Sequence, residues 1–63
     1  MPLILTAREL ADRLKVRPST ILAWHRRGWI PGLRAGRRPV LFDLVAVEEA
    51  LRRRARESEA EHG

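Results

Sequence analysis

The sequence predicts a small, mainly α-helical domain of three helices, with a two-stranded β-hairpin between the second and the third. Apolar residues recur at helical spacing in two short segments near the N-terminus. A basic stretch with a glycine turn follows, and then a third segment of helical spacing. A chain of 63 residues is near the lower size at which one apolar core holds a fold. The chain has no cysteine, which excludes disulfides and thiolate zinc sites.

A capping box marks the start of the first helix. Thr6 and Glu9 have the spacing in which the hydroxyl caps the third helical residue and the carboxylate reaches back to the cap. Leu5 and Leu10 stand where a hydrophobic staple would form. Apolar residues then continue with the period of an amphipathic helix. We place this helix at residues 7–14.

A tight turn and a proline separate the second helix from the first. Residues 15–17 form a three-residue connection, and Pro18 suits a first helical position, where the N–H it lacks would be unpaired anyway. We place this helix at residues 18–27, with Gly28 as a left-handed stop. His25 falls on the inner face and is expected to be a structural histidine.

A basic hairpin, called the wing below, is predicted at residues 33–42. Residues 33–34 form its first strand, Ala35-Gly36 its turn and residues 37–42 its second strand. Pro39 restricts the second strand to a sheet edge, which a two-stranded hairpin tolerates.

Asp43 is predicted to cap a third helix. Residues 57–63 contain a single apolar residue, so we expect a disordered polar tail there and a folded domain at residues 1–56. Three side chains of the third helix would close the core: Leu44, Val47 and Leu51.

Two short helices joined by a tight turn and followed by a hairpin form the winged variant of the helix-turn-helix architecture.

The charges are segregated along the chain. The net charge is +5, and residues 13–42 contain no Asp or Glu. A field of one sign over half of a small domain attracts polyanions. Arginine forks suit phosphates and guanine edges better than lysine does. The eight cations of this stretch are Arg13, Lys15, Arg17, Arg26, Arg27, Arg34, Arg37 and Arg38.

Five short segments carry a more specific resemblance. In their order along the chain they resemble the excisionase branch of MerR-like DNA-binding domains, over about residues 3–52. The resemblance implies a helix, a turn, a recognition helix, a short link, a basic wing and a closing helix. Arg17 departs from this pattern, because these domains often have a serine or similar cap there. The segments are LTARELA (5–11), PSTI (18–21), RRG (26–28), IP (30–31) and RAGRR (34–38).

The expected DNA contacts follow from this arrangement, in which the second helix enters the major groove and the wing the minor groove. Those of the helix are Arg17, Ser19, Thr20, Leu22, Ala23, Arg26 and Arg27. Those of the wing are Arg34, Gly36, Arg37 and Arg38.

Some of these residues have specific expected roles. Arg26 is the leading candidate to read a guanine, and Arg27 is expected to bind the backbone. Ser19 and Thr20 would contact phosphates or base edges at the helix N-terminus, or else only support its first turn. In the wing, Arg37 or its neighbour Arg38 is expected to enter a narrow minor groove, with Arg34 on the flanking backbone.

Other conspicuous residues receive structural or open interpretations. Trp24 is expected in the core, whereas Trp29 covers the core edge, packs under the wing or contacts a partner. The arginine run at 52–56 is either a solvated helix end or a handle for DNA or protein. His25 and His62 are far apart in sequence with no cysteine or acidic cluster nearby, so no metal site is expected.

These observations predict a sequence-specific double-stranded DNA-binding protein without catalytic residues, cofactor or small-molecule substrate. The resemblance favours an excisionase of a phage or mobile element, acting with an integrase or with further copies on adjacent sites. The lack of a heptad run after the third helix favours it over full-length MerR-type regulators. The alternatives are a small MerR-like transcription regulator and a basic module that binds an acidic protein.

The N-terminal segment is too short and too quickly polar for a signal peptide. No apolar run approaches the roughly 18 residues of a membrane span. We therefore expect a soluble, cytoplasmic, nucleoid-associated protein that makes no contact with a membrane.

Overall fold

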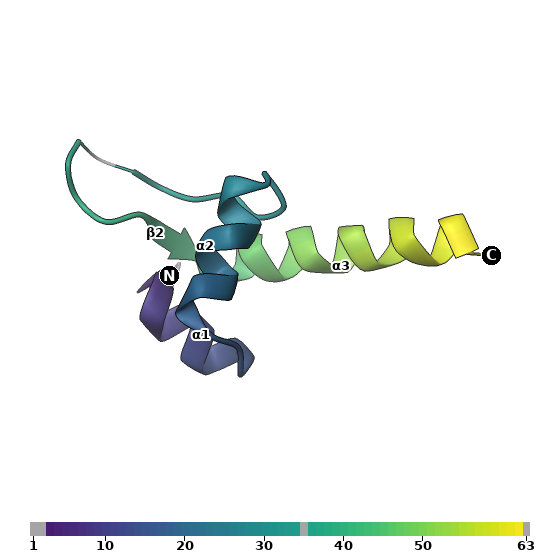
Figure 1. Ribbon diagram of the computed structural model, residues 1–63, viewed down its shortest axis with the longest axis horizontal. Helices are drawn as coiled ribbons and strands as arrows, with labels where there is room; N and C mark the ends of the chain where they lie inside the picture. The colour runs from purple at the N-terminus through teal and green to yellow at the C-terminus, as the bar shows by residue number, and fades with distance from the viewer. Residues whose placement is uncertain (1–2, 35, 63) are drawn as a thin grey trace.

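Three helices and a two-stranded antiparallel sheet make up the described part of the protein, which confirms the predicted fold class. The computed structural model describes residues 3–34 and 36–62, and only the backbone of residues 59–62. In Figure 1, α1 and α2 lie together, the wing extends to one side and α3 to the other. The elements are β1 (Ile4–Thr6), α1 (Ala7–Leu14), α2 (Pro18–Arg26), β2 (Leu41–Asp43) and α3 (Leu44–His62).

The capping box at the start of α1 is present. The Glu9 N–H donates to Thr6 Oγ1 at 3.1 Å, and the Thr6 N–H donates to Glu9 Oε1 at 3.0 Å. Leu5 and Leu10 on either side of the cap are both buried, as the predicted staple requires. The predicted helix at residues 7–14 is confirmed.

The end of α1 is closed by a left-handed residue that the sequence pattern did not reveal. Lys15 has φ +61°, a conformation that side chains other than glycine seldom adopt. The Val16 N–H donates to the Ala11 carbonyl at 2.9 Å and the Lys15 N–H donates to the Asp12 carbonyl at 3.4 Å. This pair of bonds is a Schellman motif. It turns the chain sharply from α1 into α2.

The end of α2 uses the same motif, here with the predicted glycine. Gly28 has φ +78°, and its N–H donates to the His25 carbonyl at 3.0 Å. The Trp29 N–H donates to the Trp24 carbonyl at 2.9 Å. The helix therefore ends one residue earlier than predicted, with Arg27 as its C-cap.

The sheet joins different segments from those predicted. β1 pairs with β2 in antiparallel register, with Leu5 opposite Phe42. Within the wing the pairing is reduced to one bridge, Leu33 with Leu41. Pairing with β1 buries both Leu5 and Phe42 in the core, whereas a longer hairpin would meet Pro39, which has no N–H to donate. Ala35, half of the predicted turn, lies outside the described residues.

α3 begins at the predicted cap. Asp43 Oδ1 accepts a hydrogen bond from the Val45 N–H at 3.1 Å. Val47 is fully buried, and Leu44 and Leu51 pack against the core from the same helix. The buried core is Leu5, Leu10, Ala11, Ile21, Ile30, Phe42 and Val47.

The second half of α3 differs from the prediction. The helix continues to His62, where we expected a disordered tail from Glu57. Arg, Glu and Ala are good helix formers, and they dominate this stretch. Arg52 and Glu48 form an ion pair at i, i+4 spacing, 3.9 Å apart, which supports the helical turn before this stretch. The domain boundary at residue 56 stays a prediction.

Candidate nucleic-acid interface

One side of α2 is packed and the other is open. Ile21 is fully buried and His25 is half-buried. On the opposite side Ser19 and Arg26 are exposed, and Leu22 keeps 44% of its surface accessible. The seven residues expected to contact DNA from this helix and its ends are all exposed, except Thr20 and Ala23, which are half-buried.

The N-terminal end of α2 carries no side-chain cap. Arg17 is the N-cap residue, with extended backbone (φ −83°, ψ 148°) and no hydrogen bond from its side chain to the helix. Its carbonyl accepts from the Thr20 N–H at 2.9 Å. Pro18 has no N–H, and the Ser19 N–H has no backbone acceptor within the part of the chain described. A donor and a nearby guanidinium are therefore available at this positive helix end.

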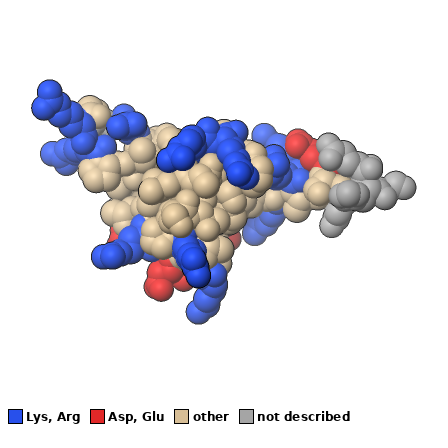
Figure 2. Space-filling model, viewed as in Figure 1, with Lys and Arg blue, Asp and Glu red and all other residues tan. Residues whose placement is uncertain are grey.

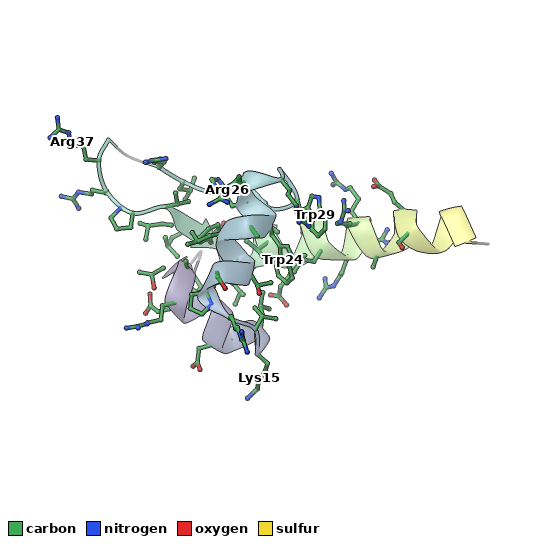
Figure 3. The ribbon with its side chains drawn as sticks, viewed as in Figure 1. Lys15, Trp24, Arg26, Trp29 and Arg37 are labelled. Carbon is green, nitrogen blue, oxygen red and sulfur yellow. The ribbon has the colours of Figure 1, made fainter. Side chains whose placement is uncertain are left out.

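The wing is a loop on a short stem. Leu33 and Leu41 exchange both backbone hydrogen bonds, at 2.7 and 2.8 Å. At the tip, Gly36 has φ +63°, and its left-handed conformation supports the tight turn. Figure 3 shows Arg37 pointing away from the body at this tip. The other expected wing contacts, Arg34 and Arg38, are exposed as well.

The root of the wing rests on the inner face of α2. The His25 ring meets the Phe42 ring edge to face, at 5.7 Å between centroids and an interplanar angle of 87°. His25 thus has the structural position predicted for it, between the helix and β2. The position of the wing relative to α2 is therefore fixed by packing as well as by the chain.

Positive charge surrounds the open face of α2. In Figure 3, Lys15 projects from the turn below α2, Arg26 from the upper end of the helix and Arg37 from the wing tip. Figure 2 shows Lys and Arg atoms at the same three places around a centre without charge. Among the described side chains, Arg52 and Glu48 form the one ion pair with a separation within 4 Å. Figure 2 also shows Asp or Glu atoms beside the lower group, but among the described side chains no cation around α2 forms an ion pair within 4 Å.

The family of helix-turn-helix domains matches residues 4–55. The chain belongs to this family. Neither curated proteins nor solved structures gave a match. Membership of the helix-turn-helix family indicates DNA as the partner, and domains of this kind are typically non-enzymatic. No helix in the described part of the chain is both long and apolar enough to cross a membrane.

The helix-turn-helix domain also contains a contact that sequence reasoning missed. The guanidinium carbon of Arg54, in α3, lies 3.5 Å from the centre of the Trp29 ring, and that of Arg27 lies 5.1 Å from it. One signal was present in the sequence. Arg54 follows the buried Val47 by seven residues, which places it on the inward side of the helix. Trp24 packs against the core, as expected.

The ligands of a metal centre do not come together in the described part of this helix-turn-helix domain. No group there brings together three side chains from His, Cys, Asp and Glu. The side chains that surround the open face of α2 are exposed cations. A field of one sign attracts anions.

Proposed function

We propose that this protein binds double-stranded DNA by placing α2 in the major groove and the wing in the adjacent minor groove. The observation that carries the proposal is a continuous segment without acidic residues, from Arg13 to Phe42. It supplies both the open face of α2 and the wing. A major groove about 12 Å wide admits a helix, and arginines are attracted into narrow minor grooves.

The α2 residues divide into base readers and backbone contacts in this proposal. Arg26, exposed on the open face, reads a guanine with its two parallel N–H donors. Leu22 and Ala23 meet a thymine methyl group. The backbone contacts come from Arg27 and from the N-terminal end of the helix, where Arg17, Ser19 and Thr20 face a phosphate.

The wing supplies the second set of contacts. Arg37 or Arg38 enters the minor groove, Gly36 lets the tip turn between them and Arg34, and Arg34 binds the flanking phosphates. The support for this role is the projection of the tip away from the body and the exposure of all three arginines.

The biological role we infer is that of an excisionase, a directionality factor for recombination. The support is the resemblance of the five segments at residues 5–11, 18–21, 26–28, 30–31 and 34–38 to that branch of MerR-like domains. A single small module buries only about 600–1,000 Å² on DNA. To distinguish its target site from the other sites of a genome, the protein then needs an integrase or further copies of itself bound alongside.

Binding to DNA is tested by the salt dependence of affinity for duplexes taken from DNA that flanks the gene. We expect the logarithm of the binding constant to fall steeply with the logarithm of salt, by about 0.9 for each phosphate contact. The double variant Arg37→Ala/Arg38→Ala should flatten the slope, whereas Arg52→Ala, which removes an arginine paired with Glu48, should not. An affinity for duplex DNA that does not change with salt would instead favour a protein as the partner.

The excisionase role is tested by footprinting on the same DNA with and without a candidate recombinase. An extended footprint and excision that requires this protein would support it. Protection of a promoter alone, with no effect on recombination, would indicate a MerR-like transcription regulator instead.

A further inference from the structure

Trp29 holds two arginine side chains from distant parts of the chain. Arg54 of α3 stacks on the indole and Arg27 lies beside it, with guanidinium carbons 3.5 and 5.1 Å from the ring centre. Both arginines are exposed and the indole is half-buried. Figure 3 shows Trp29 where the segment after α2 meets α3. The indole therefore brings one arginine of the run at 52–56 next to the end of the proposed recognition helix.

The two guanidinium groups carry the same charge and lie beside the same ring. Their separation cannot exceed the two distances from the ring taken together, which is within the screening length of about 10 Å at 0.1 M salt. They therefore repel each other, although each is attracted to the face of the indole. Trp29 and Arg54 line a groove together with Glu49 and Glu57, and Arg27 lies outside that lining. No carboxylate among the described side chains lies within 4 Å of either arginine. A phosphate that contacts both guanidinium groups would relieve this repulsion.

The two arginines beside Trp29 are continuous with the rest of the positive surface. Arg27 is the C-cap of α2 and follows Arg26 directly. Figure 2 shows Lys and Arg atoms both at the end of α2 and on the neighbouring part of α3. A duplex whose major groove holds α2 would have the phosphates of one strand beside this end of the helix.

We propose that Arg27, Trp29 and Arg54 form a phosphate clamp that extends the DNA interface from α2 onto α3. This inference rests on the proposed function and assigns a role to one member of the arginine run. The indole fixes the two guanidinium groups before DNA arrives, so little side-chain freedom is lost on binding. Each then donates charge-assisted hydrogen bonds to a backbone phosphate.

The test compares two substitutions on α3. Arg54→Met keeps an unbranched chain over Trp29 but removes the charge. Arg52→Met removes an arginine that pairs with Glu48. For Arg54→Met we expect the salt slope of duplex binding to lose about 0.9, so that its affinity falls about three-fold less than that of the wild type over a four-fold rise in salt. The control Arg52→Met should keep the wild-type slope, and Arg54→Lys should largely restore it.

The outcomes separate this clamp from the proposed function. Steep binding by the wild type with an unchanged slope for Arg54→Met overturns the clamp alone, and a lowered melting temperature of that variant would then assign Arg54 to packing. Arg54→Lys with the slope of Arg54→Met, in a folded protein, also overturns it. If the wild type does not bind duplex DNA, the proposed function fails and the clamp fails with it.

Discussion

Gly32 lies against the imidazole of His25, so closely that a β-carbon at position 32 would be 2.6 Å from His25 Nε2. The same β-carbon would be 2.7 Å from Cγ1 of Val40. His25 belongs to the inner face of α2, and the other two residues belong to the root of the wing. The absence of a side chain at Gly32 therefore lets the wing pack directly on the proposed recognition helix.

Replacement of Gly32 by alanine should destabilise the protein by about 1–3 kcal/mol, the usual cost of overpacking. The imidazole cannot move freely because it is packed edge-on against Phe42, and Val40 is stiff because it branches at its β-carbon. Thermal or denaturant unfolding measures the loss. Gly36→Ala measures a different cost, which does not involve packing. There a β-carbon meets nothing within 4 Å, and only the left-handed backbone is strained.

A double variant checks the cause. Val40→Ala makes room for the new methyl group, so Gly32→Ala should cost less in that background than in the wild type. Equal costs in both backgrounds would show that the contact with Val40 does not limit the packing.

Lys15 offers a second stability prediction. Its φ of +61° is left-handed, a conformation that costs roughly 1–2 kcal/mol for a residue with a β-carbon. Lys15→Gly should therefore be more stable than Lys15→Ala by about 1 kcal/mol in denaturant unfolding. Both variants lose the same charge, so electrostatics cancels in the comparison. Equal stabilities would mean that the greater freedom of glycine in the unfolded chain offsets the relief of strain.

Features set by neighbouring residues were predictable from the sequence. The capping box of Thr6 and Glu9, the glycine stop at Gly28 and the cap at Asp43 each depend on a few consecutive residues, and all are present. Lys15 is the local exception. Tertiary packing of α1 against α2 imposes a left-handed turn there, although no glycine marks it.

Features set by distant residues were not predictable. The pairing of Leu5 with Phe42 joins the N-terminal strand to the strand that precedes α3, and a local hairpin was the simpler expectation for the same strand. The stacking of Arg54 on Trp29 joins the link after α2 to α3. Both contacts depend on where complete elements pack, and the spacing of residues within one element carries little of that information.

Arg26 and Arg27 should give different binding defects. Arg26→Ala should relax specificity at one base pair by about 1–3 kcal/mol, because a guanine loses its two hydrogen bonds. Arg27→Ala should weaken binding to all sequences alike and reduce the salt slope by about 0.9. Affinity measured over a set of single-base variants of the site, at two salt concentrations, separates the two effects. A uniform loss for Arg26→Ala would reduce its role to a backbone contact.

Replacement of Arg17 by serine should change the stability of the protein and its affinity for DNA in opposite directions. It holds the N-cap position of α2 with suitable backbone geometry but no capping side chain. Arg17→Ser supplies the missing acceptor and should raise the free energy of unfolding by about 1 kcal/mol. It also removes a cation beside the helix end, so duplex binding should weaken and lose about 0.9 of its salt slope.

Arg17→Ala is the control that separates cap from charge, since it removes the guanidinium without adding an acceptor. It should reproduce the binding defect of Arg17→Ser while gaining none of its stability. Paired unfolding and binding measurements on the two variants decide the matter. A stabilised Arg17→Ser that keeps the wild-type salt slope would show that this arginine faces no phosphate, and the uncapped end of α2 would then need another explanation.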